Sequence, residues 1–227
     1  MAWIPSEKEE KKKLLVQLGK EYRDKCYRDN SPRDCHYLAH FMVTLQEAAK
    51  AATIFRKTCD EYQYGESCQL YAGLLRAFKF AGVDPIESFR YDRKGCQLGR
   101  AKSCLNTALD IVSDGNVRQV VDEDKPDLLV VEMLDRGCNL GCDDSCYLAG
   151  GAYLVGVPGL LEKNVSTAYK YDVKACQLGN KLACANLSGA LPMKTNGAMS
   201  NAFQVRRLQL KINKELSEKS PKLPGTT

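Results

Sequence analysis

The sequence predicts an all-α protein, a right-handed α/α solenoid of about five helix pairs that are stapled by disulfides. Three observations predict this fold. Ten of the eleven cysteines form pairs at a spacing of eight or nine residues. The first cysteines of successive pairs lie 33, 37, 42 and 38 residues apart, which is the range of helix-pair repeats. No segment shows the alternating, valine- and isoleucine-rich pattern of a strand.

The cysteine spacing indicates bridges between the end of one helix and the start of the next. Bridged cysteines need Cα atoms about 5.5 Å apart, and a helical corner brings residues at this spacing to that distance. The expected pairs are Cys26/Cys35, Cys59/Cys68, Cys96/Cys104, Cys138/Cys146 and Cys176/Cys184. Cys142 is left over and is expected to be a free thiol.

A helix is expected over about residues 6–26, followed by alternating helices of roughly 10 to 17 residues. Pro85 and Pro126 mark helix starts, because proline is favoured in the first turn. Glycine and proline also predict where the chain turns. The expected turns are residues 30–32, 114–116, 158–159 and 196–197.

Three kinds of residue recur at fixed offsets from the cysteines. A small residue stands four positions after each second cysteine, where it allows close helix packing. In four of the five pairs a cation stands two positions before the first cysteine, where it complements the negative end of a helix. In three pairs a glycine stands three positions after the first cysteine, as in a helix C-cap. The small residues are Ala39, Ala72, Ala108, Gly150 and Ser188. The cations are Lys57, Lys94, Arg136 and Lys174, and the glycines are Gly99, Gly141 and Gly179.

The repeats continue without a Pro/Gly/Ser-rich linker, so one solenoid domain is the simplest organisation. Residues 1–27 are expected to form an N-terminal helix that packs on the solenoid, and residues 28–212 the solenoid itself. Residues 213–227 are expected to be a disordered C-terminal tail, because they are charged and carry few apolar side chains.

Zinc is the main competing explanation for the cysteines. Structural zinc sites favour two to four residues between ligands and often include a histidine. The sequence has no CxxC, and Gly141 is expected to break the run from Cys138 through Cys142 to Cys146. No metal site is therefore expected. The missing CxxC also disfavours a thioredoxin-like enzyme, and no GxSxG, Walker or HExxH motif is present.

Disulfides persist in oxidising compartments, which usually implies a secretory signal. The N-terminal residues contain no apolar core of a signal peptide, and no stretch approaches the ~18 apolar residues of a membrane span. These features point to the mitochondrial intermembrane space. The net charge of +5 is small and dispersed, so no nucleic-acid partner is expected.

Ala168–Gly189, AYKYDVKACQLGNKLACANLSG, resembles a Sel1-like repeat, which is related to tetratricopeptide repeats. Together with CYRDNSPRDCHYL and CDEYQYGESCQLYAG, it resembles the Sel1-repeat cytochrome c oxidase assembly factors of animal mitochondria. The resemblance covers about residues 22–210. It implies a soluble, disulfide-bonded protein of the intermembrane space that supports biogenesis of respiratory complex IV. It also implies haem binding and thiol–disulfide exchange with copper-delivery proteins.

Three classes of function fit the sequence. The favoured class is a monomeric binding and assembly module that needs no cofactor. It would dock proteins of complex IV assembly on a concave face lined by one helix from each pair. The second is a thiol–disulfide oxidoreductase, or a haem-linked reductase, with Cys142 as its spare thiol. The third is a secreted bacterial cysteine-rich Sel1-like protein that binds β-lactams, which the missing signal peptide disfavours.

His36 and His40 are the only histidines and are the candidate ligands of a haem or metal. The alternative is a partly exposed pair beside the Cys35 bridge. Met193 and Met199 are expected to be packing or loop residues, although a thioether is a known axial haem ligand.

Cys142 has two interpretations. It is an inert thiol if the adjacent Asp143 and Asp144 disfavour the thiolate. It is exchange-competent if it attacks the neighbouring bridge or the disulfide of a partner.

Overall fold

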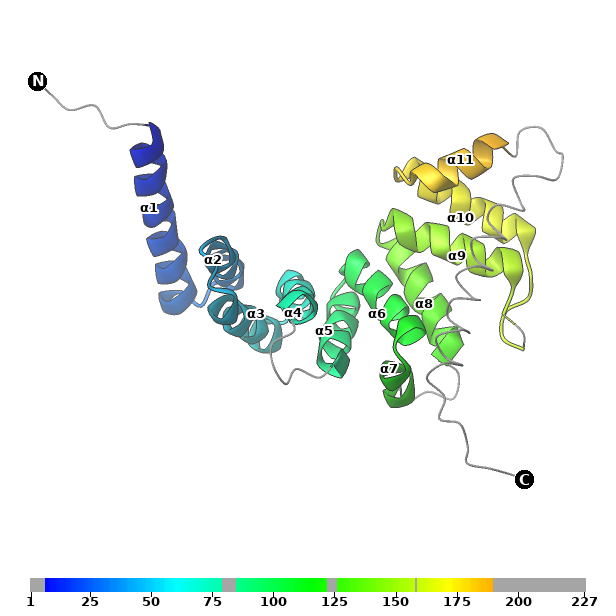
Figure 1. Cartoon of the computed structure of the whole chain (residues 1–227), viewed down its shortest axis with the longest axis horizontal. Helices are drawn as coiled ribbons and strands as arrows, with labels where there is room; N and C mark the ends of the chain where they lie inside the picture. Colours follow the sequence, from blue (N-terminus) through cyan, green and yellow to red (C-terminus); the bar gives the residue numbers. More distant parts are fainter. Residues whose placement is uncertain (1–6, 79–84, 122–125, 158, 190–227) are drawn as a thin grey trace, which may run out of the picture. The chain divides into compact units, whose positions relative to one another are not determined.

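The computed structural model describes residues 7–78, 85–121, 126–157 and 159–189. The regular structure of this part of the chain is helical, apart from one antiparallel bridge between Val157 and Leu161. The all-α prediction is therefore confirmed. The helices, shown in Figure 1, are α1 (Glu7–Arg28), α2 (Pro32–Thr44), α3 (Ala48–Tyr62), α4 (Gly65–Phe78), α5 (Pro85–Gln97), α6 (Ala101–Ser113), α7 (Gly115–Val120), α8 (Pro126–Asn139), α9 (Asp143–Val155), α10 (Val165–Gln177) and α11 (Lys181–Gly189).

The chain divides into two compact units. The N-terminal unit ends at Leu98 and contains α1 to α5, each packed against the next. Its core gathers buried side chains from α1 to α4, with Leu38 and Phe55 almost completely enclosed. Tyr22 of α1 packs against this core, so the N-terminal helix is attached to the pair that follows it.

The C-terminal unit begins at Gly99 and contains α6 to α11. Here α6 packs on α8, α8 on α9, α9 on α10 and α10 on α11. The short helix α7 departs from the turn expected at residues 114–116. Asp114 Oδ1 caps it by accepting the Asn116 amide at 2.8 Å, and Val117 anchors it as a buried side chain. Capping and burial together convert the turn into a helix.

The predicted helix boundaries follow local chemistry. Pro85 and Pro126 begin α5 and α8. Gly99, Gly141 and Gly179 adopt φ angles of 83°, 93° and 103°, the left-handed conformation that ends a helix at glycine. The N-terminal helix ends at Arg28, two residues later than expected. The chain then turns, and Ser31 caps the start of α2.

The small residues four positions after the second cysteines are buried in four of the five repeats. Ser188 differs because it is exposed near the end of α11, and its hydroxyl donates to the carbonyl of Ala185 at 2.9 Å. The described chain ends one residue later, so no described segment covers it. The expected turn at residues 196–197, Met193, Met199 and the tail at 213–227 lie outside the described residues, and the proposed domain boundaries remain predictions.

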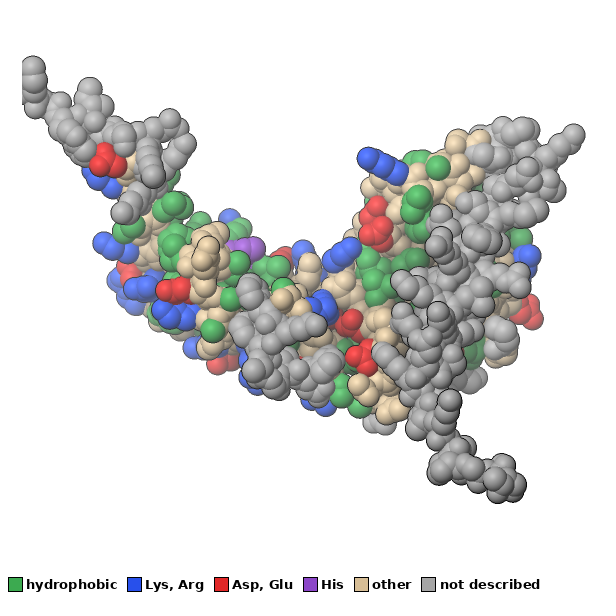
Figure 2. All heavy atoms as spheres, in the orientation of Figure 1, with side chains coloured by type: hydrophobic (Ala, Val, Ile, Leu, Met, Phe, Trp, Pro, Cys, Tyr) green, Lys and Arg blue, Asp and Glu red, His purple; other side chains and the backbone are tan. Residues whose placement is uncertain are grey.

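Charged side chains of both signs are interspersed with apolar ones on the face of each unit that Figure 2 shows. This distribution agrees with the small net charge of the sequence. Within the described ranges, no helix combines the length and apolar character that crossing a membrane requires.

Candidate functional site

Disulfides close the helix corners in both units. Four bridges join cysteines eight or nine residues apart, with Cα–Cα distances of 4.5 to 4.8 Å. They are Cys26–Cys35, Cys59–Cys68, Cys138–Cys146 and Cys176–Cys184. Cys96 and Cys104 are also disulfide-bonded. Of the four, only Cys176–Cys184 has partly exposed cysteines, so we expect a reductant to reach this bridge first.

The helices joined by a bridge approach each other closely. The residue before the first cysteine is Gly137 in α8, and a Cβ atom there would lie 2.4 Å from Ser145 Oγ and 2.9 Å from Ser145 Cβ. Ser145 is fully buried and directly precedes the second cysteine, Cys146. The corner therefore has no room for a methyl group at Gly137.

Lysine and tyrosine side chains link the first helices of successive pairs. In the N-terminal unit, Lys94 Nζ donates to Asp60 Oδ1 at 2.9 Å, and Tyr91 Oη donates to Asp60 Oδ2 at 2.8 Å. In the C-terminal unit, Lys174 Nζ donates to Asn139 Oδ1 at 2.9 Å. Asp60 and Asn139 directly follow the first cysteine of the preceding pair. The recurring lysine was expected to complement the negative end of its own helix. The structure shows that it also joins its repeat to the previous one.

Two cavities of the N-terminal unit lie along the first helices of the pairs, α1, α3 and α5. A cavity of about 360 Å³ is lined by residues of α1, α2 and α3, including Tyr27 and Ile54. A second, of about 470 Å³, is lined by residues of α3 and α5. Residues of α3 line both cavities, and α1 and α5 each line one, so these three helices are here named the α1/α3/α5 face. The concave docking face lined by one helix from each pair stays a prediction.

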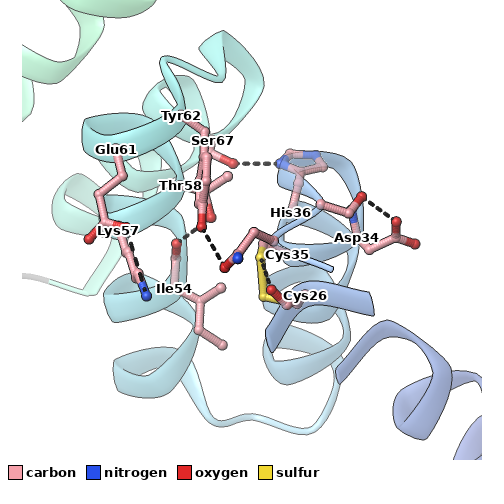
Figure 3. Close-up of a disulfide and its surroundings, with 12 residues drawn as sticks. Cys26, Asp34, Cys35, His36, Ile54, Lys57, Thr58, Glu61, Tyr62 and Ser67 are labelled. Atoms are coloured by element: carbon pink, nitrogen blue, oxygen red, sulfur yellow. Dashed lines mark hydrogen bonds and ion pairs between the residues drawn. A yellow bond between two sulfur atoms is a disulfide. The ribbon is translucent and has the colours of Figure 1, made fainter. Parts of the chain in front are cut away.

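His36 and His40 lie on α2, as predicted, but they differ in exposure. His36 is buried, which corrects the expectation of a partly exposed pair. Figure 3 shows its ring pointing toward Ser67 of α4, and the Nδ1–Oγ distance is 3.0 Å. The rings of Phe55 and Tyr64 pack against it at centroid distances of 5.4 and 5.2 Å. His36 is therefore part of the contact between the first two helix pairs, which the sequence pattern did not reveal.

This geometry does not fit a haem held by both histidines. The two rings belong to one helix, with centroids 4.9 Å apart and planes at 79°. Axial ligands approach an iron from opposite faces of the macrocycle, which two rings in edge contact on one helix do not do. His40 is exposed, so it is the imidazole available to a ligand. In the described part of the chain, no three His, Cys, Asp or Glu side chains are grouped as a metal site.

Cys142 is free and buried, at the N-cap of α9 in the turn that the Cys138–Cys146 bridge spans. Its side chain packs with Leu105, Leu134 and two alanines. The acidic neighbours contact other repeats: Asn180 Nδ2 donates to Asp144 Oδ1 at 3.2 Å, and Lys102 Nζ donates to Asp144 Oδ2 at 3.4 Å. Burial among apolar side chains favours the inert interpretation, since thiol exchange needs access to the sulfur.

The fold resembles solved structures of Sel1-repeat proteins. A Sel1 repeat protein from Oxalobacter formigenes superposes with a TM-score of 0.60 at 17% identity, covering 94% of this chain and 90% of that chain. A protective antigen of uropathogenic Escherichia coli with an SLR fold also gives 0.60, at 18% identity, over 85% of this chain and 41% of that one. The helix pairs and their bridges therefore define a disulfide-stabilised Sel1-repeat protein. No family model matches the sequence.

Sequence relatives define the family more closely. Cytochrome c oxidase assembly factor 7 of Xenopus tropicalis is 32% identical over 186 residues, 79% of this chain and 78% of that protein. The Drosophila melanogaster homolog of the same factor is 27% identical over 96% of this chain and 94% of its own length. The chain belongs to the cytochrome c oxidase assembly factor 7 family.

Proposed function

We propose that this chain is a factor of the mitochondrial intermembrane space that supports assembly of cytochrome c oxidase by docking partner proteins. The observation that carries the proposal is the match to assembly factors over most of the chain, combined with bridged cysteines in every repeat. Bridges of this kind persist in oxidising compartments, which supports the location. The partners proposed are proteins of complex IV assembly, including copper-delivery proteins.

The α1/α3/α5 face supports docking rather than catalysis. Solenoids bind partners along surfaces built by equivalent helices of successive repeats. The two cavities described above are lined by residues of these helices, whereas the free thiol of Cys142 is buried in the C-terminal unit. The proposal therefore assigns the chain a binding role with no required cofactor.

Cells that lack the chain test this proposal. Loss should lower assembled complex IV on native gels and its oxygen consumption, and the wild-type chain should restore both. The protein should resist protease in intact mitochondria and become sensitive when the outer membrane is ruptured. Normal complex IV in its absence would refute the assembly role. Asn164 and Asn186 each stand two residues before a serine, as in glycosylation acceptors. Glycans on either would refute the location.

Haem binding is tested separately with purified, oxidised protein. If the chain binds haem through histidine, the proposed ligand is His40, because its side chain is exposed whereas that of His36 is buried. His40→Ala should then remove the low-spin histidine spectrum, whereas His36→Gln should retain it. A spectrum that survives His40→Ala would place the ligand elsewhere.

A further inference from the structure

The cavity between α3 and α5 is strongly charged. It has a volume of about 470 Å³ and is lined by Arg56, Asp60, Glu87, Arg90, Tyr91 and Lys94. Its volume lies in the range of small-ligand sites. Three of the lining side chains are cations and two are carboxylates, so the cavity carries one positive charge in excess at neutral pH.

Both carboxylates of the cavity already have donors. Asp60 accepts from Tyr91 and Lys94, as described above, and Glu87 Oε1 accepts from Tyr71 Oη at 2.8 Å. The rings of Tyr71 and Tyr91 pack edge to face with centroids 4.5 Å apart. Burial, followed by the contact with Asp60, raises the pKa of Tyr91, so its phenol remains a donor at neutral pH. The two tyrosines thus hold the carboxylates in place.

The two arginines of the cavity, Arg56 and Arg90, make fewer close polar contacts than the carboxylates do. Arg90 is exposed one turn before Lys94, and among the described residues no ion-pair partner of Arg90 is found. Arg56 contacts the hydroxyl of Tyr91, which raises the pKa of the guanidinium. Its Nε lies 3.8 Å from Asp60 Oδ2, beyond direct hydrogen-bond distance, and its side chain is 59% exposed, so most of its five N–H donors remain available. Two guanidinium groups from neighbouring repeats therefore face the cavity with donors to spare.

We propose that this cavity binds a carboxylate of a partner polypeptide, with Arg56 and Arg90 as its donors. The planar fork of a guanidinium matches the two oxygens of a carboxylate. The single excess charge suits a monoanion, and the tyrosine rings and aliphatic arginine stems offer apolar contacts to the adjoining peptide. The carboxylate comes either from an Asp or Glu side chain or from a chain terminus. The inference rests on the proposed docking role and assigns that role a chemistry.

Nuclear magnetic resonance titration of the full oxidised chain at low salt tests the inference. One probe is a neutral peptide with a free C-terminal carboxylate, and the other is a peptide capped at both ends with a single Glu. At least one should shift the side-chain signals of Arg56 and Arg90, and the tighter probe identifies the carboxylate source. The matched peptide that carries Gln and an amidated end should not bind.

Substitutions complete the test. Arg90→Ala should weaken binding about tenfold, because it removes charge-assisted hydrogen bonds, and Arg90→Lys should weaken it less. Arg33→Ala removes an exposed cation that does not line the cavity and should leave binding unchanged. Equal binding of the Gln peptide, or undiminished binding by a folded Arg90→Ala variant, would overturn the inference.

Complementation separates this inference from the proposed function. If Arg90→Ala restores complex IV as well as wild type does, the assembly role stands and the cavity is not its docking site. If the wild-type chain itself fails to affect complex IV, the assembly role fails, whatever the peptides show.

Discussion

Gly137→Ala tests the close approach of α8 and α9 at the Cys138–Cys146 corner. The new Cβ would lie 2.4 and 2.9 Å from two atoms of Ser145 and 3.3 Å from the carbonyl oxygen of Ala101. Carbon contacts are optimal at about 3.5–4.0 Å. The side chain of Ser145 must therefore move or the helices must separate, and the bridge opposes separation. Overpacking of this kind costs about 1–3 kcal/mol.

The matched control is Gly73→Ala in α4. A Cβ at Gly73 would meet no atom within 4 Å, so the substitution should stabilise the protein by about 0.4–1 kcal/mol through the entropy of the unfolded chain. The free energies of unfolding of both oxidised variants are measured with urea, followed by circular dichroism. Ser145→Gly should recover much of the loss in the Gly137→Ala background, which a double-mutant cycle detects. Equal stability of Gly137→Ala and Gly73→Ala would show that the corner is not closely packed.

Three further predictions concern the thiols and the buried phenols. Under mild reduction, alkylation should first label Cys176 and Cys184, and mass spectrometry of the labelled peptides checks the order. Cys142→Ser should leave mixed-disulfide capture with copper-delivery proteins and complex IV support unchanged, because the thiol is buried; loss of either would favour the exchange-competent interpretation. Burial and the Glu87 contact raise the pKa of Tyr71 to about 12. Stability from this phenol should be complete below about pH 10, the unfolded pKa, and should fall as the pH rises toward 12; Tyr71→Phe should remove that alkaline loss from urea midpoints.

Much of the fold was predictable because its signals are local. Proline at the start of α5 and glycine after α8 act on the backbone within one turn, and the cysteine spacing sets the corner. The burial of His36 depends instead on Phe55 and Ser67, which lie 19 and 31 residues away along the chain. The sequence gives no local signal for such packing.

The α3/α5 cavity was missed for the same reason. Its residues stand in two helices whose contacts join positions 31 and 34 apart, such as Tyr91 and Lys94 with Asp60. The recurrence of the lysine two positions before the cysteine was visible, but its partner was not. Comparing the residues that directly follow each first cysteine would have suggested Asp60 and Asn139 as acceptors.

The short span of each bridge also affects how the disulfides form while the chain folds. Ten cysteines can be paired in hundreds of ways. Each of the four bridges within the units nevertheless joins two cysteines that are only eight or nine residues apart in the sequence. Each corner is then able to oxidise as soon as its own two helices exist, without waiting for distant segments. Cys142 is the one local competitor, four residues from both Cys138 and Cys146. Leu105 and Leu134 belong to the buried cluster that encloses Cys142, so we expect packing of α9 to disfavour wrong bridges to Cys142.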